Sequence, residues 1–286
     1  MTDRSTRVAA FEACRARLFG IAYRMLGERD AAEDVVQETW LRYARSTDVR
    51  DAEAWLVRVA TRLAIDQLRV ARARRDAYPG PWLPEPLPTG PDPARDLDRA
   101  EALSLALLAA LERLSPLERA VFLLREAFGY GYADIAAIVG RRQDHCRQVG
   151  RRARTRVRDE ARSVPADPEA HARLLETFLS AAAEGDLATL ESLLAEDVEL
   201  VSDGGGRVAA ARRPLHGRDA VTRFLVGVAA KAAPDTTGEV TLANGEPVAV
   251  VREDGAPVVA VAIAVADGRI RRVFMVRNPD KLRGFA

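Results

Sequence analysis

The chain has 286 residues, of which 48% are hydrophobic and 30% charged, with two cysteines and a formal net charge of +1. This length predicts two or three domains with hydrophobic cores, and the composition excludes a wholly disordered chain, a disulfide scaffold and a membrane span of about 18 apolar residues. The small net charge hides an asymmetry, because residues 1–162 hold 29 basic and 24 acidic side chains whereas residues 163–286 hold 14 and 18. Clustered positive charge favours a polyanion partner, although solvated basic helices without such a partner are equally common.

The start of the chain is charged and has no signal-peptide pattern, so we expect a cytoplasmic protein that contacts no membrane. Cys14 and Cys146 stand alone, without the spacing of a zinc site or a redox pair. The sequence therefore predicts no metal site and no cofactor.

Residues 8–76 show the pattern of a set of helices. Asp30 and Glu33 have capping-box spacing and predict a helix from Asp30 to about Arg45, and Asp51 can cap the next helix. In that next helix the apolar residues recur every three or four positions, so one side packs and the other presents arginines. These arginines are Arg58, Arg62, Arg69 and Arg72.

Residues 77–95 contain seven prolines and predict an extended linker, because proline removes backbone donors and disfavours helix in the residue before it. Trp82 and Leu83 are unusual in such a segment. Since the linker cannot form a core of its own, we expect these two side chains to pack on an apolar surface elsewhere.

A helical pattern returns over residues 96–114, and Ser115-Pro116-Leu117-Glu118 is a strong helix start for a helix through about Ala127. A short helix over 132–139 is closed by Gly140, and an arginine-rich helix follows over about 143–162. A short helix, a glycine turn and a long basic helix are the layout of a helix-turn-helix motif.

The residues after Pro168 have a different character. Helices are expected at about 168–184 and 186–195, followed by apolar runs that are separated by Asn244-Gly245, Asp254-Gly255 and Asp267-Gly268. These dipeptides are hairpin-turn signals. The tail therefore predicts an α+β domain of about 120 residues with an antiparallel sheet.

Several of these segments resemble a known family. Residues 34–40, 54–60 and 66–69 resemble the second conserved domain of sigma-70 family sigma factors, and residues 114–158 resemble the fourth. The lack of a third domain between them resembles the extracytoplasmic-function group, whose members direct RNA polymerase to promoters. The resemblance implies a sigma-2 domain at 1–76, a proline-rich linker at 77–95 and a sigma-4 domain at 96–162.

Three further short segments resemble the signatures of one subgroup, in which a C-terminal SnoaL-like domain regulates the sigma factor in cis. The resemblance thus implies two all-α domains followed by an α+β SnoaL-like cone at 167–286, and an intramolecular contact between this domain and the linker. The implied regulatory interface consists of Trp82, Leu83, Pro84, Glu85 and Pro86 in the linker with Asp203, Gly204, Gly205, Gly206, Arg207, Asn278, Pro279, Asp280, Lys281 and Leu282 in the tail.

The resemblance also assigns two surfaces to the sigma-2 domain. One is the helix that docks on core RNA polymerase in this family, here with Asp30, Glu33, Asp34, Gln37 and Glu38, although acidic residues at a helix start also interact favourably with the helix dipole. The other faces the downstream promoter element, here with Arg58, Thr61, Arg62, Arg69 and Arg72. Trp55 begins the apolar side of its helix, so we expect it in the core.

The basic helix after Gly140 fits recognition of the upstream promoter element. Arginine and glutamine near the start of such a helix can make bidentate contacts to bases, whereas arginines further along suit phosphates. The first group is Arg141, Arg142, Gln143, Arg147 and Gln148, and the second is Arg151, Arg152, Arg154 and Arg158. Within them we expect Arg147 and Gln148 to read bases and Arg152 and Arg154 to bind phosphates.

Two alternatives stay open. The tail could be an enzyme with Asp203 or His216 as acid or base, but no acid–base pair stands out, so no catalytic residue is predicted. The chain could instead be a DNA-binding regulator that responds to a small molecule in the C-terminal cavity and needs no polymerase. The acidic helix at 30–38 favours the sigma factor, because a simple repressor has no use for it.

Overall fold

The computed structural model describes residues 2–89, 103–161 and 167–286, and their contacts divide the chain into two compact units. Residues 1–76 and 110–158 belong to the first, and residues 77–89, 103–109 and 159–286 to the second. The first half of the linker therefore groups with the C-terminal domain. The predicted helix start at 96–102 and the linker prolines Pro91 and Pro93 lie outside the described residues.

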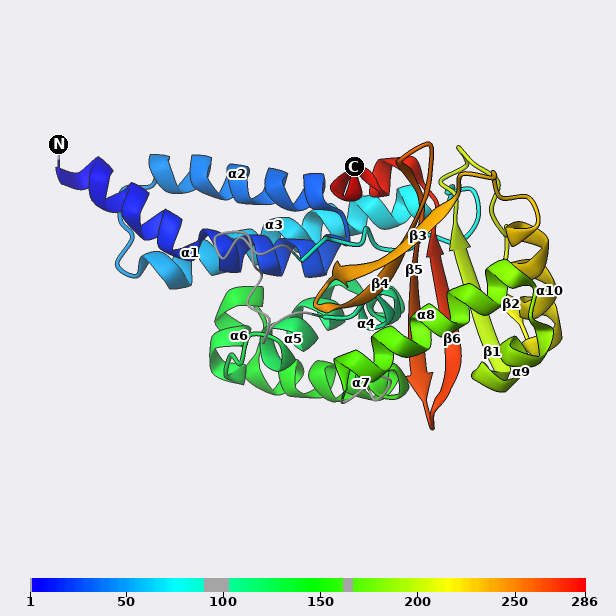
Figure 1. Ribbon diagram of the computed structural model, residues 1–286. Helices are drawn as coiled ribbons and strands as arrows, with labels where there is room; N and C mark the ends of the chain where they lie inside the picture. The colour runs from blue at the N-terminus through cyan, green and yellow to red at the C-terminus, as the bar shows by residue number, and fades with distance from the viewer. Residues whose placement is uncertain (1, 90–102, 162–166) are drawn as a thin grey trace. The chain divides into compact units, whose positions relative to one another are not determined.

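The first unit begins with three helices, α1 (Thr2–Leu26), α2 (Arg29–Arg45) and α3 (Ala52–Arg75) (Figure 1). The Asp51 carboxylate accepts a hydrogen bond from the Ala54 N–H and caps α3, as predicted. The prediction of a capping box at Asp30 was wrong, because α2 begins at Arg29 with Glu28 as its N-cap residue. Asp30 therefore lies in the first turn of the helix. Trp55 packs against Tyr43 with ring centroids 5.6 Å apart, but it is only half-buried, so it lies at the edge of the core and not inside it as expected.

The remaining helices of the first unit contain the helix-turn-helix motif. They are α4 (Leu105–Leu111, whose first five residues group with the second unit), α5 (Pro116–Glu126), α6 (Tyr132–Val139) and α7 (Gln143–Ala161). Ser115 and Glu118 form the predicted capping box, and Gly140 ends α6 in the left-handed conformation at φ 66°. Gly150 lies inside α7 where a Cβ atom would come within 2.8 Å of the Tyr132 hydroxyl, so packing of α6 on α7 explains this glycine.

The second unit is an α+β domain, as predicted. Its helices are α8 (Pro168–Glu184), α9 (Leu187–Leu193) and α10 (Arg218–Ala229), and 3₁₀ turns η2 (Pro279–Lys281) and η3 (Arg283–Phe285) end the chain. Its strands are β1 (Leu194–Asp203), β2 (Leu215–His216), β3 (Thr237–Ala243), β4 (Glu246–Glu253), β5 (Ala256–Ala266) and β6 (Arg269–Val276).

The six strands form one sheet in the order β2-β1-β6-β5-β4-β3. The three predicted dipeptide turns join β3 to β4, β4 to β5 and β5 to β6, and Asn244, Asp254 and Asp267 each have positive φ. The expected all-antiparallel sheet was wrong in one respect, because β1 pairs with β6 in parallel. This pairing joins strands that are far apart in the chain, so no local turn signal specifies it.

The sheet has two different faces. Helices α8, α9 and α10 contribute to the larger core on one face, together with side chains such as Leu200, Ile263 and Val273. The other face carries a second core of small and apolar side chains, among them Val250, Ala262 and Phe274. Leu83 from the linker packs into this second core, so the linker covers part of a sheet face that no helix of α8–α10 covers.

Candidate functional site

One face of α2 presents the side chains that were predicted to contact polymerase. Asp30, Glu33, Asp34 and Gln37 are exposed and Glu38 is half-buried, and their spacing of three and four residues places them along one side of the helix. The opposite side is buried. Leu41 continues the exposed face with 42% of its surface accessible, so an apolar side chain lies beside the carboxylates.

The arginines of α3 differ in what they contact. Arg58 and Arg69 are exposed, and Arg69 forms an ion pair with Asp66 at 2.7 Å. Thr61 is fully buried, so in this conformation it cannot contact DNA, contrary to the prediction. Helical periodicity places Thr61 next to the arginines but does not show that it falls on the packed side.

Two of the arginines predicted to contact DNA are bonded to the helix-turn-helix part of the same unit. Arg62 donates to the Ile138 carbonyl at 2.8 Å, at the end of α6. Arg72 donates to the carbonyls of Glu112 and Leu114. In this conformation these two guanidinium groups bind protein carbonyls, although the sequence predicts that they face promoter DNA.

A buried ionic cluster lies beside Arg72. Glu112 accepts hydrogen bonds from Arg75 and Arg119, and Arg119 also donates to the Arg24 carbonyl at 2.9 Å. Burial raises the pKa of Glu112, but the charges and hydrogen bonds of Arg119 and Arg75 outweigh it and leave that pKa below its usual value. The cluster therefore joins α1, α3 and α5 through buried charges that compensate one another.

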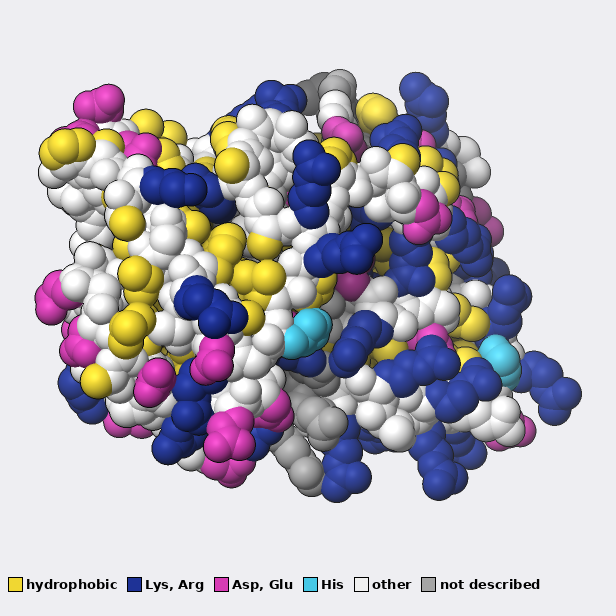
Figure 2. Space-filling view, turned by 90° about the vertical axis from the view of Figure 1, so that its right-hand side faces the viewer, with side chains coloured by type: hydrophobic (Ala, Val, Ile, Leu, Met, Phe, Trp, Pro, Cys, Tyr) yellow, Lys and Arg dark blue, Asp and Glu magenta, His cyan; other side chains and the backbone are white. Residues whose placement is uncertain are grey.

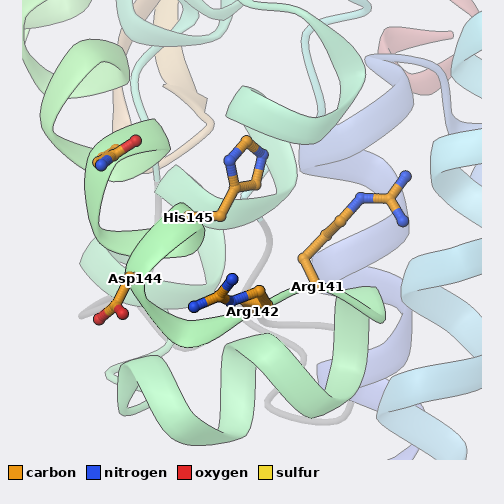
Figure 3. Close-up of a pocket in the computed structure, with 5 residues that line it drawn as sticks. Arg141, Arg142, Asp144 and His145 are labelled. Atoms are coloured by element: carbon orange, nitrogen blue, oxygen red, sulfur yellow. The ribbon is translucent and has the colours of Figure 1, made fainter.

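The start of α7 borders an open hollow of about 660 Å³ (Figure 3). Arg141, Arg142, Asp144, His145 and Gln148 line it, and all five side chains are exposed. Figure 3 shows that Asp144 and His145 point to different sides of the helix. Hydrogen-bond donors of three kinds thus surround one opening beside the first turns of the predicted recognition helix.

The other predicted DNA-binding residues of α7 are exposed, but Arg147 and Arg154 also contact side chains of the protein. Arg147 is 3.7 Å from Asp144, in a pair that is open to solvent. Arg154 lies 3.4 Å from Glu126 and donates to the Tyr132 hydroxyl at 3.2 Å, so a phosphate would have to replace these partners. Figure 2 shows that Lys and Arg side chains are common on the face that it draws, among acidic and apolar side chains.

The linker and the tail meet around Asp203, which is fully buried at the end of β1. Its carboxylate accepts hydrogen bonds from the Tyr78 hydroxyl at 2.6 Å and from the Leu83 N–H at 2.9 Å. The Lys281 ammonium group lies 2.7 Å from the same carboxylate and donates to the Leu83 carbonyl at 2.5 Å. We call Asp203, Asn278 and Lys281 the linker-binding site.

Aromatic and apolar contacts complete this site. The Lys281 Nζ atom lies 4.2 Å from the centre of the Trp82 ring and 5.3 Å from that of Tyr78, within range of cation–π attraction. Asn278 donates from its amide to the Tyr78 hydroxyl at 3.0 Å. Leu83 is 2% exposed, and burial of such a side chain contributes about 1.5–3 kcal/mol.

Glycines after Asp203 allow close approach. A Cβ atom at Gly205 would lie 2.5 Å from the Asn278 side chain, and one at Gly206 would lie 2.6 Å from Pro79. Both residues have positive φ. Arg207 lies 3.0 Å from Asp280 in an exposed ion pair, so the two tail segments of the predicted interface also contact each other.

The structure thus brings together most of the residues predicted for the regulatory interface. Leu83, Pro84, Glu85 and Pro86 are buried, and Trp82 is half-buried. Tyr78 was missed by the sequence analysis, because it lies outside the short linker signature. Its position four residues before Trp82, as a second aromatic residue in the linker, was the available signal.

Neither residue considered for acid–base catalysis is placed for it. Four donors surround the Asp203 carboxylate, including the Gly205 N–H at 3.0 Å. His216 is exposed at the end of β2. His171 on α8 is buried, and burial lowers the pKa of its imidazole.

His145 is a second residue that the sequence analysis missed. Arginine and glutamine dominate the sequence pattern of this helix, and His145 stands between Asp144 and Arg147 in its first turn. Across residues 2–89, 103–161 and 167–286, no group of three His, Cys, Asp or Glu side chains has the arrangement of a metal site. Within the same ranges, no helix is both long and apolar enough to cross a membrane.

Comparison with known proteins gives a consistent result. Residues 10–74 match Sigma-70 region 2, and residues 104–157 match Sigma-70, region 4. The chain is 38% identical over 291 aligned residues to the ECF RNA polymerase sigma factor SigJ of Mycobacterium tuberculosis, with 97% of this chain and 93% of that protein covered. It is 37% identical over 191 residues to the probable ECF RNA polymerase sigma factor SigI of the same species, with 65% and 66% covered. The crystal structure of Mycobacterium tuberculosis SigJ matches with a TM-score of 0.79 and 37% identity, covering 97% of this chain and 98% of that one.

Proposed function

Because this chain belongs to the extracytoplasmic-function sigma factors of the sigma-70 family, we propose that it directs core RNA polymerase to specific promoters and that its C-terminal domain regulates this in cis. The observation that carries the proposal is the pairing of an exposed acidic helix α2 with a helix-turn-helix in one chain. A specificity subunit needs both surfaces, one for the enzyme and one for DNA. It acts where the polymerase acts, in the cytoplasm, and it is not an enzyme.

The α2 face is the proposed polymerase contact. Its carboxylates are exposed, apart from the half-buried Glu38, and surface charges of this kind add little to the stability of the fold. A partner can therefore use them without disturbing the domain. Leu41 supplies an apolar contact on the same face, at a position that a protein partner can cover. Core polymerase is the partner that the family implies.

The proposed DNA contacts divide between α3 and α7. On α7, Gln148 and the arginines at the hollow have the donors that base edges in a major groove accept. Arg151 and Arg152 are exposed and suit phosphates, which position the protein without selecting a sequence. On α3, Arg58 and Arg69 face solvent and are available for the downstream element.

Regulation in cis is supported by the bonds that Arg62 and Arg72 make in this conformation. Both arginines donate to protein carbonyls, so promoter binding through them requires those bonds to be exchanged for bonds to DNA. The conformation is therefore a closed one in our proposal. We assign the separate roles to residues 1–76, 96–162 and 167–286, with the linker at 77–95 between the first two.

The linker-binding site supports control by the C-terminal domain. The buried pair of Asp203 and Lys281 also bonds the linker backbone at Leu83. These bonds stabilise the closed state only while the linker is in place. When the linker leaves, Asp203 and Lys281 regain water, so the closed state is favoured by a limited free energy that polymerase binding can exceed. The linker can thus be held and released without unfolding of the domain.

The test is binding of the full chain to core polymerase and to promoter DNA, each alone and together. We expect the chain to bind core polymerase in the absence of DNA and to bind promoter DNA strongly only in the presence of core. A chain that binds a specific DNA sequence alone and shows no affinity for core would be the ligand-responsive DNA-binding regulator instead.

A further inference from the structure

The chain beyond Leu83 makes a second set of contacts, with an edge of the C-terminal sheet. Strand β3 is the last strand of the sheet, and Pro88 forms an antiparallel bridge with Ala243 at its end. The Thr89 N–H donates to the Leu242 carbonyl at 2.8 Å, and the Asn244 N–H donates to the Leu87 carbonyl at 2.8 Å. Residues 87–89 therefore pair with β3 in the way that an added strand does.

Side chains reinforce this pairing from both partners. The Asn244 side-chain oxygen accepts from the Leu87 N–H at 3.0 Å, and the Thr89 hydroxyl accepts from the Gly245 N–H at 3.0 Å. Leu87 and Asn244 are 8% and 5% exposed, so the bond between them lies away from water, whereas the bond between Gly245 and Thr89 is exposed. The turn that joins β3 to β4 thus contacts the linker directly, in addition to its role in the hairpin.

Proline and glycine fit the geometry of this contact. Pro88 has no N–H and lies between the two residues whose N–H groups are used, as expected for proline in an edge strand. It is exposed, so the added segment presents no further donor at that position. On its other side a Cβ atom at Gly284 would lie 2.9 Å from the Pro88 ring, so the C-terminal turn η3 also contacts the segment.

We propose that the end of β3 and the Asn244-Gly245 turn form a second binding site for the linker, which takes residues 87–89 as an added strand. We call it the edge site. It shares no residue with the linker-binding site at Asp203, Asn278 and Lys281. The two sites act on different peptide groups, Leu83 in one and Leu87 to Thr89 in the other, so each can be released while the other is occupied.

The edge site deepens the proposed control in cis, on which its consequence for transcription rests. Leu105 and Ala106 pack in the same sheet-face core as Leu83. The C-terminal domain therefore contacts the chain on both sides of residues 90–102, which connect the two sigma domains. Loss of the Asp203 contacts alone leaves this connection attached at the edge site, and release of the linker takes two steps.

The test uses two substitutions of Asn244 that its backbone accepts. Asn244 has φ 56°, which glycine adopts freely and aspartate tolerates. Asn244→Asp keeps an oxygen acceptor for the Leu87 N–H, whereas Asn244→Gly removes it. Amide hydrogen exchange is measured on the full chain at Leu83, Leu87 and Thr89, with amides in the middle of β4 as a check that the sheet is intact.

We expect exchange at Leu87 to be roughly tenfold faster in Asn244→Gly than in the wild type, and nearly unchanged in Asn244→Asp. Exchange at Leu83 should be the same in all three. Conversely, Trp82→Ala should speed exchange at Leu83 and leave Leu87 and Thr89 protected. This pattern would establish two independent sites.

Three results would overturn the proposal. The first is exchange at Leu87 and Thr89 in the wild type that is as fast as in an unstructured peptide. The second is an equal exchange rate at Leu87 in the two Asn244 variants. The third is faster exchange at all three amides in Trp82→Ala. None of these readouts involves polymerase or DNA. A failure of the proposed sigma-factor function would therefore appear in the polymerase-binding test and leave the exchange pattern unchanged.

Discussion

Replacement of Lys281 by methionine tests the linker-binding site at its most buried charge. Lys281 is 4% exposed, and its ammonium group bonds both the Asp203 carboxylate and the Leu83 carbonyl. Methionine keeps much of the length and apolar bulk of the side chain and removes the charge. The Asp203 carboxylate then stays buried with the Tyr78, Leu83 and Gly205 donors but without a counter-charge.

Removal of one partner of a buried ion pair costs about 3–5 kcal/mol, because the other charge is left without compensation. The loss of cation–π attraction to Trp82 adds about 0.5–2 kcal/mol. Asp203 can avoid this penalty if the linker leaves and water reaches the carboxylate. The penalty therefore favours the open linker rather than the unfolded domain. Together the two contributions shift that equilibrium by about 2.5 to 5 powers of ten.

The assay is amide exchange at Leu83 together with limited proteolysis of residues 77–89 in the full chain. Lys281→Met should accelerate both strongly, while amides in the centre of the sheet stay protected. Lys231→Met is the matched control, since Lys231 is the other lysine of the sequence and is exposed at the end of α10. If Leu83 exchanges at the same rate in Lys281→Met and Lys231→Met, the linker-binding site does not depend on the buried charge and our reasoning is wrong.

Three further predictions concern the other surfaces. Charge reversal at Asp34 and Glu38 should weaken binding to core polymerase with little change in thermal stability, because both side chains lie on the open face of α2; unchanged affinity would remove the docking assignment. In a promoter library, Gln148→Ala should relax the base preference at particular positions, at a cost of about 1–3 kcal/mol per contact. Arg152→Ala should weaken binding to all sequences alike and reduce its salt dependence. Equal responses of the two variants would contradict this division of α7. Burial raises the pKa of Glu246 to about 7 from its usual 4.5, so the folded state binds this proton more tightly than the unfolded state. The resulting stability is fully present below about pH 4.5 and is lost as the pH rises through about 7, and urea unfolding of Glu246→Gln should lack this slope; an identical pH profile in the wild type and the variant would refute it.

Local signals in the sequence predicted most of the helices and turns. Ser115 with Glu118, Gly140 and the Asn244-Gly245 turn each act over a few residues, so their structural effect can be read without knowledge of the rest of the chain. The parallel pairing of β1 with β6 could not be predicted in this way, since Leu200 and Val273 are far apart in sequence. Long-range pairing depends on which faces of the strands are covered, and the sequence pattern does not state that.

The residues of the candidate sites also divide into those that a local pattern predicts and those that depend on distant parts of the chain. Trp82 and Leu83 could be predicted to need a surface, because apolar residues in a proline-rich segment have no core of their own. The hydrogen bonds of the Tyr78 hydroxyl could not be predicted, because their partners Asp203 and Asn278 lie far away in the sequence. Thr61 shows the opposite error, because a residue next to arginines on a helix can still point into the core.

The central claim is that this chain gives core RNA polymerase its promoter specificity. Run-off transcription with purified core polymerase, the full chain and a library of promoter fragments measures this directly. We predict initiation from a small set of promoters only when the chain is present, and an altered yield from the same promoters in Lys281→Met. No initiation above that of core polymerase alone, with a chain that is folded, would contradict the claim.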